Sequence, residues 1–275
     1  MKQLLRRALN RCGYDIHSLR VADTDKSGTR EENDPQQDLS RHVYDQDGLR
    51  SIHNHDFMFN LDFMRAYNRG RLAADEDYHF HWRVHIALWA AYSAMRLNGD
   101  YVECGVNRGF VSSAIMEFLD WNQHEQTFYL LDTFNGIDPS TLSEDDLQHG
   151  VLDRNKALLA SEHYVKSAES AKINFSQWRN VRIVEGSIPQ TLSLINPTAI
   201  AYLHLDLNCA GPEIEAIKFF WNRLLPGAII LLDDYAFRGY ESQKRAWDIF
   251  AQQKQVMIAS LPTGQGLLLK PPGVE

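Results

Sequence analysis

The pattern of apolar and polar residues is regular from about residue 80 onward, where helical and strand-like segments alternate. Apolar residues recur at helical spacing in the longer segments, and β-branched and apolar residues fill the short runs between them. The short runs predict strands at 101–104, 128–133, 181–186, 199–207, 228–235, 256–261 and 266–270. Such alternation is typical of a mostly parallel sheet covered by helices. The short connection PTGQ before the last strand predicts an antiparallel pair at the end of the chain.

The segments between the strands predict the helices that cover this sheet. They are 81–97, 110–119, 188–195, 212–224 and 241–253. The fourth is expected to end at Pro226 and Gly227, because this pair stops a helix. Several tryptophans lie at helical spacing among apolar residues and are therefore predicted to be core residues: Trp82, Trp89, Trp221 and Trp247.

The chain before the first predicted strand divides into three segments. Residues 1–21 predict a short amphipathic helix, because four apolar residues share one face: Leu4, Leu5, Ala8 and Leu9. Residues 22–41 are almost entirely polar and carry both charge signs, so we expect a mobile linker there. Residues 42–98 are expected to form a helical extension that packs on the core.

The remainder of the chain, 99–275, is predicted to be a single catalytic domain. The sequence has 275 residues, of which 44% are hydrophobic, and this suffices for a sizeable core. A polar, helix-prone insert at about 138–178 interrupts the domain between the second and third strands. We expect this insert to be lid-like.

Charge and cysteine content exclude several classes of protein. With 28 basic and 36 acidic residues the net charge is −8, which provides no positive field to hold DNA or RNA. The longest apolar run, 86–92, is far shorter than the roughly 20 residues of a membrane-spanning helix. Arginines interrupt the first residues before an export signal forms, so a cytoplasmic location is expected. Three separated cysteines predict reduced thiols: Cys12, Cys104 and Cys209.

A turn with two glycines follows the first predicted strand, at the sheet edge where ligands bind in parallel sheets. It runs from Glu103 through Gly105 and Asn107 to Gly109, directly before a helix. The glycines allow a tight turn and the close approach of a ligand, although they could also serve only to pack strand on helix. A dinucleotide-binding turn has a glycine where Asn107 stands. The turn therefore favours a ligand that needs one close approach, such as an adenosyl amino acid.

Polar residues also end the second and third predicted strands. Asp132 ends the second, where a carboxylate can accept hydrogen bonds from both hydroxyls of a ribose. Glu185, Gly186 and Ser187 end the third, at about the distance expected for an adenine. Each could instead be a turn residue, with Ser187 as the N-cap of the next short helix. Their shared position at strand ends favours cofactor binding.

Three more carboxylates follow the fourth and fifth predicted strands, namely Asp206 and the pair Asp233 and Asp234. Carboxylates that converge at adjacent strand ends repel one another unless a cation or protons intervene. Ligation by oxygen alone favours Mg²⁺, with Mn²⁺ or Ca²⁺ as alternatives. The three aspartates are therefore predicted metal ligands, although Asp234 could merely accept hydrogen bonds in its turn.

Five stretches between about residues 101 and 250 carry a family resemblance: VECGVNRGFVSS, YLLDTFNGI, VRIVEGSIPQTL, YLHLDLN and LLPGAIILLDDY. Through them the chain resembles the class I S-adenosylmethionine-dependent methyltransferases and, within these, the macrocin O-methyltransferase family of metal-dependent sugar methyltransferases. The resemblance implies a doubly wound, Rossmann-like α/β fold with seven mostly parallel strands, helices on both faces and the last strand antiparallel. It also implies that Glu103, Gly105, Asp132 and 185–187 surround the cofactor, and that relatives bind a divalent ion at the aspartate positions.

One position departs from the family. Relatives often carry an aspartate two residues after the first metal aspartate, where it is thought to act as base, and this chain has Asn208 there. An amide cannot accept the proton at neutral pH. His204 shares a strand face with Asp206 by the two-residue period, and we take these two as the predicted catalytic residues. Other candidate bases are His149 and His163 in the insert.

Together these features predict an S-adenosylmethionine-dependent and divalent-metal-dependent O-methyltransferase. Its expected partner is a small-molecule acceptor, a sugar or glycosylated compound, and self-association is left open. A bound Mg²⁺ or Mn²⁺ is expected to lower the pKa of the hydroxyl that attacks the methyl group. The alternatives are an NAD-type oxidoreductase on a similar sheet and a cofactor-binding partner protein without catalysis.

Overall fold

The computed structural model describes residues 43–274 of the chain. The predicted helix at 1–21, the predicted linker at 22–41 and Cys12 lie outside these residues. The other two cysteines are buried and free. Within the described part of the chain, no helix is both long and apolar enough to cross a membrane.

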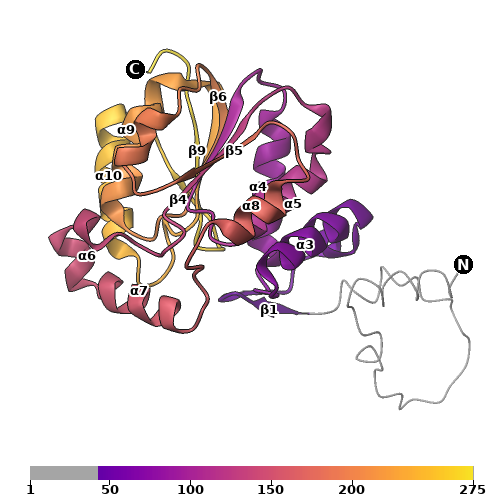
Figure 1. The fold of residues 1–275 in the computed structure, drawn as a ribbon, viewed down its shortest axis with the longest axis horizontal. Coiled ribbons are helices and arrows are strands. Elements are labelled where there is room, and N and C mark those ends of the chain that lie inside the picture. The colour runs from indigo at the N-terminus through magenta and orange to yellow at the C-terminus, as the bar shows by residue number, and fades with distance from the viewer. Residues whose placement is uncertain (1–42, 275) are drawn as a thin grey trace, which may run out of the picture.

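Seven strands form one sheet through the centre of the molecule (Figure 1). They are β3 (Asp100–Cys104), β4 (Phe128–Asp132), β5 (Val181–Glu185), β6 (Ile200–Leu205), β7 (Leu224–Leu232), β8 (Ala259–Ser260) and β9 (Gly266–Leu269). Their order is β5-β4-β3-β6-β7-β9-β8, and the strands from β5 to β7 in this order run parallel. β9 is antiparallel to both β7 and β8. This confirms the predicted doubly wound sheet with its last strand antiparallel.

The order of strands creates the ligand-binding edge. β6 lies inside the sheet and all of its residues are buried, so its sequence is apolar except at His204 and does not alternate. The chain order reverses at β3, which has β4 on one side and β6 on the other. Beyond the carboxyl ends of strands, such a switch point leaves a crevice in which ligands bind.

Helices cover both faces of the sheet (Figure 1). The long helices are α3 (Leu61–Ala74), α4 (His81–Ala94), α5 (Phe110–Phe118), α9 (Ala210–Phe220) and α10 (Glu241–Lys254). The first three belong to an apolar cluster that includes Tyr101 and Tyr202, and the other two belong to a second cluster that includes Val102 and Leu203. Because successive residues of a strand point to opposite faces, β3 and β6 contribute to both clusters.

The N-terminal extension contains more than the predicted helices. It begins with a hairpin of β1 (Tyr44–Gln46) and β2 (Leu49–Ser51), followed by the 3-10 helix η2 (Asp56–Phe59). α3 packs closely on α5, because a Cβ at Gly70 would lie 2.5 Å from the ring of Phe110. The hairpin was not expected, since its strands are too short to show an alternating pattern.

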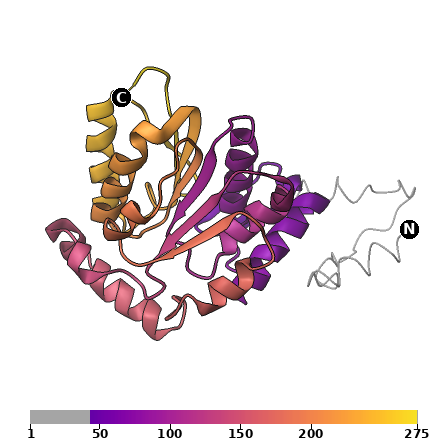
Figure 2. The ribbon, with the colours of Figure 1, turned by 45° about the horizontal axis from the view of Figure 1, so that its top comes forward.

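The insert folds into short helices. They are η4 (Pro139–Thr141), α6 (Glu144–Gln148), α7 (Val151–Ala160) and α8 (Glu169–Phe175). α6 and α7 lie together below the sheet in both ribbon views (Figures 1 and 2). The buried carboxylate of Asp146 fixes α6 to the core, because its Oδ1 accepts hydrogen bonds from Ala210 N (3.2 Å) and Ser242 Oγ (2.7 Å). The insert is thus joined to α9 and α10, and its movement as a lid stays a prediction.

Several boundaries differ from those expected. β7 begins at Leu224, so Pro226 and Gly227 lie inside the strand and do not precede it. The pairing register of β6 with β7 shifts between Ile200 and Tyr202, which gives the irregularity that a proline in a strand requires. Three shorter elements are 3-10 helices: η3 (Trp121–Gln123), η5 (Gln190–Leu194) and η6 (Trp221–Arg223).

The prediction of a core position is wrong for Trp89, which is 50% exposed. Trp82 is partly buried, and Trp221 and Trp247 are buried as expected. α4 is apolar around most of its circumference, as its sequence HWRVHIALWAAYSA shows, so periodicity does not identify its buried side.

Candidate active site

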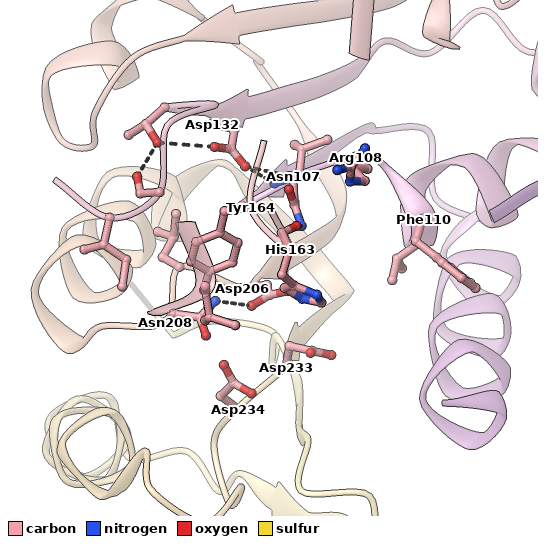
Figure 3. A pocket seen from close by; sticks show the side chains of 18 of the residues that line it. Asn107, Arg108, Phe110, Asp132, His163, Tyr164, Asp206, Asn208, Asp233 and Asp234 are labelled. Carbon is pink, nitrogen blue, oxygen red and sulfur yellow. Dashed lines mark hydrogen bonds between the residues drawn. The ribbon is translucent and has the colours of Figure 1, made fainter. Parts of the chain in front are cut away.

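A cavity of about 510 Å³ opens beyond the carboxyl ends of the parallel strands (Figure 3). The ends of several strands, the N-terminal extension and the insert all contribute to its wall. Most residues predicted for the site line it: Glu103, Gly105, Asn107, Asp132, Ser187, Asp206, Asp233 and Asp234. The others are not part of its wall: Gly109, Glu185, Gly186 and His204. The predicted cofactor residues and the three aspartates therefore share one cavity.

Gly105 packs against the neighbouring strand end. Its φ is +90°, and a Cβ there would lie 1.8 Å from the carbonyl oxygen of Asp206. Gly109 has a φ of +82° and makes room for the ring of Phe175, which a Cβ would approach to 2.4 Å. Both glycines are therefore required by packing, which was the alternative interpretation of this turn. Their contact with a cofactor stays a prediction.

Asp132 joins the end of β4 to the turn after β3. Its Oδ2 accepts hydrogen bonds from Val106 N (2.5 Å) and Asn107 N (2.7 Å), and its Oδ1 accepts one from Phe134 N (2.6 Å). Thr133 Oγ1 also donates to Oδ1 at 3.4 Å. The carboxylate thus already has protein donors at both oxygens, and ribose hydroxyls would have to compete with them.

The end of β5 contributes less than expected. Glu185 is exposed and pairs with Lys172, with 3.2 Å between Oε2 and Nζ. Gly186 has a φ of +138° and lies beside the side chain of Thr191. Ser187 does line the cavity, and hydrogen bonds from Ser140 and Ser187 hold the pKa of Asp138 below its ordinary value.

Two of the three aspartates, Asp206 and Asp234, have pKa values above the ordinary value of an aspartate. Burial and the neighbouring carboxylates of Asp233 and Asp234 raise the pKa of Asp206 well above its ordinary value. Burial and Asp233 likewise raise the pKa of Asp234 to about 7. The Nδ2 of Asn208 donates to Asp206 Oδ1 at 2.9 Å, so the residue that replaces the family's aspartate holds this carboxylate in place.

The third aspartate, Asp233, is occupied by protein partners. Arg83 Nη1 lies 2.5 Å from its Oδ2, and Gln265 Nε2 donates to its Oδ1 at 2.9 Å. Although burial raises it, Arg83 and His204 hold the pKa of Asp233 below its ordinary value. Among the residues that the structure describes, no three Asp, Glu, His or Cys side chains are arranged to hold a metal ion. The three predicted ligands share the cavity wall, and their role as metal ligands stays a prediction.

Arg83 is the cavity residue that sequence reasoning missed most clearly. It comes from α4, and its side chain is 12% exposed. Its Nε lies 2.8 Å from Asp47 Oδ2 in the turn of the β1–β2 hairpin, and Nη1 is 3.8 Å from Asp234 Oδ1. The guanidinium carbon is 4.4 Å from the centre of the Phe237 ring. A single arginine in an apolar helix was the signal that could have identified it.

His204 is buried behind the cavity. Its Nδ1 donates to Glu103 Oε1 at 2.9 Å, and its Nε2 is 3.7 Å from Asp233 Oδ1. Burial lowers the pKa of His204, but the hydrogen bonds and charges of Asp233 and Glu103 raise it overall to about 10. A ring that is already protonated at neutral pH cannot take up another proton, so the geometry speaks against His204 as the base.

Residues of the insert also enter the cavity. His163 and Tyr164 line it, and Figure 3 shows the ring of Tyr164 between Asp132 and Asp206. Burial lowers the pKa of His163, which keeps this ring neutral. His149, the other candidate base of the insert, contacts Asp145 and Arg245 and is not one of the residues that line the cavity.

Comparison with known proteins gives one family. The sequence model of the macrocin-O-methyltransferase (TylF) family matches residues 88–260. Comparison with curated protein sequences gives no match. Among solved structures, the O-methyltransferase NovP is similar with a TM-score of 0.57 and 21% identity, over 69% of this chain and 79% of that one. CalS11, the calicheamicin methyltransferase, gives a TM-score of 0.49 and 15% identity, over 90% of this chain and 99% of that one. The likeness to NovP agrees with the fold.

Proposed function

Since the chain belongs to the macrocin O-methyltransferase family and is therefore an S-adenosylmethionine-dependent O-methyltransferase of the sugar-modifying type, we propose that its acceptor is a hydroxyl of a sugar or glycosylated small molecule. The family match favours a methyltransferase over the two alternatives, an NAD-type oxidoreductase and a partner protein without catalysis. The observation that carries the proposal is the single cavity, which joins the ends of β3 and β4 to Asp206 and Asp234.

The cofactor half of the cavity fits an adenosyl amino acid. Glu103 Oε2 is buried and has no hydrogen-bond partner among the described residues, so it can accept from a donor on the ligand. Ser187 offers a hydroxyl at the end of β5. Asp132 holds the intervening turn in shape through its amide hydrogen bonds. Bound there, S-adenosylmethionine supplies the electrophilic methyl group.

Asp206 and Asp234 fit a divalent cation, whereas Asp233 does not in its present contacts. Both acids face the cavity, and burial and the neighbouring carboxylates raise their pKa values, so a cation beside them would favour their charged forms. Oxygen donors of this kind suit Mg²⁺ or Mn²⁺. A cation held by these two residues would lower the pKa of the acceptor hydroxyl. Arg83 keeps Asp233 as its own ion-pair partner.

Asp206 is our proposed base. Asp206 lies at the cavity with one oxygen fixed by Asn208, and a divalent cation beside it would keep its carboxylate ionised, so that it could accept the proton of the hydroxyl. The Asn208 amide replaces the family's second acid and orients Asp206. The carboxylate of Asp233 already pairs with Arg83 and lies near the buried His204.

The test is transfer of a labelled methyl group from S-adenosylmethionine to a panel of glycosides. We expect label in at least one glycoside, and Asp206→Asn should lower turnover by about 10²–10⁴ because general-base catalysis contributes that much. Lys218→Met, on the exposed side of α9, is the control. Turnover at the full rate in Asp206→Asn would contradict the assignment of the base, and turnover unchanged by a chelator would contradict the metal.

A further inference from the structure

The side chain of Asn107 binds the main chain of the insert on both sides of one residue. Its Nδ2 donates to the carbonyl oxygen of His163 at 2.9 Å, and its Oδ1 accepts from Val165 N at 3.0 Å. The two hydrogen bonds therefore flank Tyr164. Asn107 stands where a dinucleotide-binding turn has a glycine, and a glycine could make neither bond.

Neighbouring contacts hold the same segment. Arg108 Nη2 donates to the carbonyl oxygen of Glu162 at 2.9 Å, and Tyr164 N donates to Leu158 O at 3.2 Å. The side chain of Val165 is buried in the apolar cluster that α5 and α8 share. Residues 162–165 are thus fixed to the turn after β3, and the backbone of Tyr164 has little freedom.

This arrangement directs the phenol of Tyr164 into the cavity. Figure 3 shows it between Asp132 on one side and Asp206 with Asn208 on the other. The methyl group has to pass from the cofactor half of the cavity to the aspartate half, and the ring stands at that junction. Burial and the nearby charge of Asp206 raise the pKa of Tyr164, so the phenol remains uncharged.

We propose that the ring of Tyr164 forms the wall against which the sulfonium end of S-adenosylmethionine rests, and that Asn107 is the positioning residue that holds it there. The inference rests on the proposed function. The face of an aromatic ring attracts a cation and has no such attraction for the neutral thioether that remains after transfer. Tyr164 therefore favours the methyl donor over its product, S-adenosylhomocysteine.

Calorimetric titration with both ligands tests this without an acceptor. Tyr164→Leu should weaken S-adenosylmethionine by about three- to tenfold and S-adenosylhomocysteine by less, because the cation–ring attraction is lost. Tyr164→Phe, which keeps the ring, should stay within about twofold of the wild type. Asn107→Ala should change the ratio of the two affinities in the same direction as Tyr164→Leu.

A double-mutant cycle separates positioning from general destabilisation. If Asn107 acts through Tyr164, the variant with both changes binds S-adenosylmethionine no more weakly than Tyr164→Leu alone. Asn155 provides the matched control, since its side-chain amide likewise binds both Ile137 N (2.9 Å) and Ile137 O (3.2 Å) in the insert. Any effect of Asn155→Ala should add to that of Tyr164→Leu. Melting curves check that each variant is folded.

Each result decides something. An unchanged preference for S-adenosylmethionine in folded Tyr164→Leu, or a Tyr164→Phe as weak as Tyr164→Leu, overturns the role of the ring. Additive effects of Asn107→Ala and Tyr164→Leu overturn the positioning role. A wild-type protein that binds neither ligand overturns the proposed function together with this inference, whereas normal wild-type binding with unaffected variants overturns the inference alone.

Discussion

Neighbouring aspartates at the end of β7 should respond in opposite ways to the same substitution. Asp233→Asn removes the counter-ion of Arg83, which lies 2.5 Å away, and that of His204, at 3.7 Å. Breaking a buried ion pair costs about 3–5 kcal/mol. Arg83 keeps its contact with Asp47 and His204 keeps Glu103, so we expect the lower end, about 3 kcal/mol of unfolding free energy. For a domain of this size that lowers the melting temperature by roughly 6–12 °C.

Asp234→Asn should stabilise the fold at high pH. Burial and Asp233 raise the pKa of Asp234 from 3.8 to about 7, so its ionisation in the folded state is unfavourable. Below about pH 4 both states are protonated and nothing is lost. Between about pH 4 and pH 7 the stability falls as pH rises, by at most about 4 kcal/mol in all, and above about pH 7 the loss stays constant. The substitution removes this penalty, so the variant should gain over the wild type between pH 5 and pH 8.

The assay is urea denaturation followed by circular dichroism at pH 5 and pH 8, with a chelator present so that a bound cation does not add stability. Both substitutions replace a carboxylate by an amide of the same shape, so each is the other's control. A loss below about 1 kcal/mol in Asp233→Asn would show that the Arg83 pair contributes little. A clear destabilisation of Asp234→Asn at pH 8 would refute the argument from charge repulsion.

Other residues of the site give three further expectations. Asp132→Ala should weaken S-adenosylhomocysteine at least tenfold and also lower the unfolding free energy by about 2–3 kcal/mol, because three backbone amides lose their acceptor; titration and denaturation measure the two effects. Gly105→Ala should prevent stable folding, since its Cβ would lie 1.8 Å from Asp206 O. Gly48 has a φ of +70° and no atom within 4 Å of a Cβ, so Gly48→Ala should lower the unfolding free energy by only about 1–2 kcal/mol. Thermal melts compare the two variants. His204→Gln should lower the unfolding free energy most below about pH 6.5, and the difference from the wild type should shrink toward pH 10. The reason is that the pKa of His204 is raised to about 10 and its ring stabilises the fold only while it is protonated. Denaturation at several pH values measures this difference.

The sheet could be predicted from sequence because its central strands are buried on both faces and are therefore mostly apolar runs. The segment Ile200–Leu205 shows this, since all of its residues are buried and His204 alone is polar. The carboxyl ends of parallel strands meet at one edge, so the convergence of Asp132 with Asp206 and Asp233 on one cavity also followed from the pattern. The groups that these acids contact could not be predicted from the pattern, because the contacting residues are distant in the chain.

The partners of Asn107 and Asp233 show why. Asn107 binds residues more than fifty positions away, and Arg83 reaches Asp233 across 150 positions. Local periodicity carries no information on such pairs, since each is fixed only when the layers of the fold pack together. The same limit explains His204, which lies on β6 just before Asp206 but is buried and hydrogen-bonded to Glu103.

Part of the cavity wall around the aspartates comes from residues that precede the segment matched by the family model. The family match begins at residue 88, yet Asp47, Tyr78 and Arg83 line the cavity from before that point. Arg83 neutralises Asp233, and Asp47 holds Arg83 in place through the hairpin turn. Residues within the matched segment form the cofactor half of the cavity, at the turn after β3 and at Asp132. We therefore expect cofactor binding to follow from the family segment, and acceptor choice to depend on the hairpin and on the start of α4, where another member of the family is free to carry different residues.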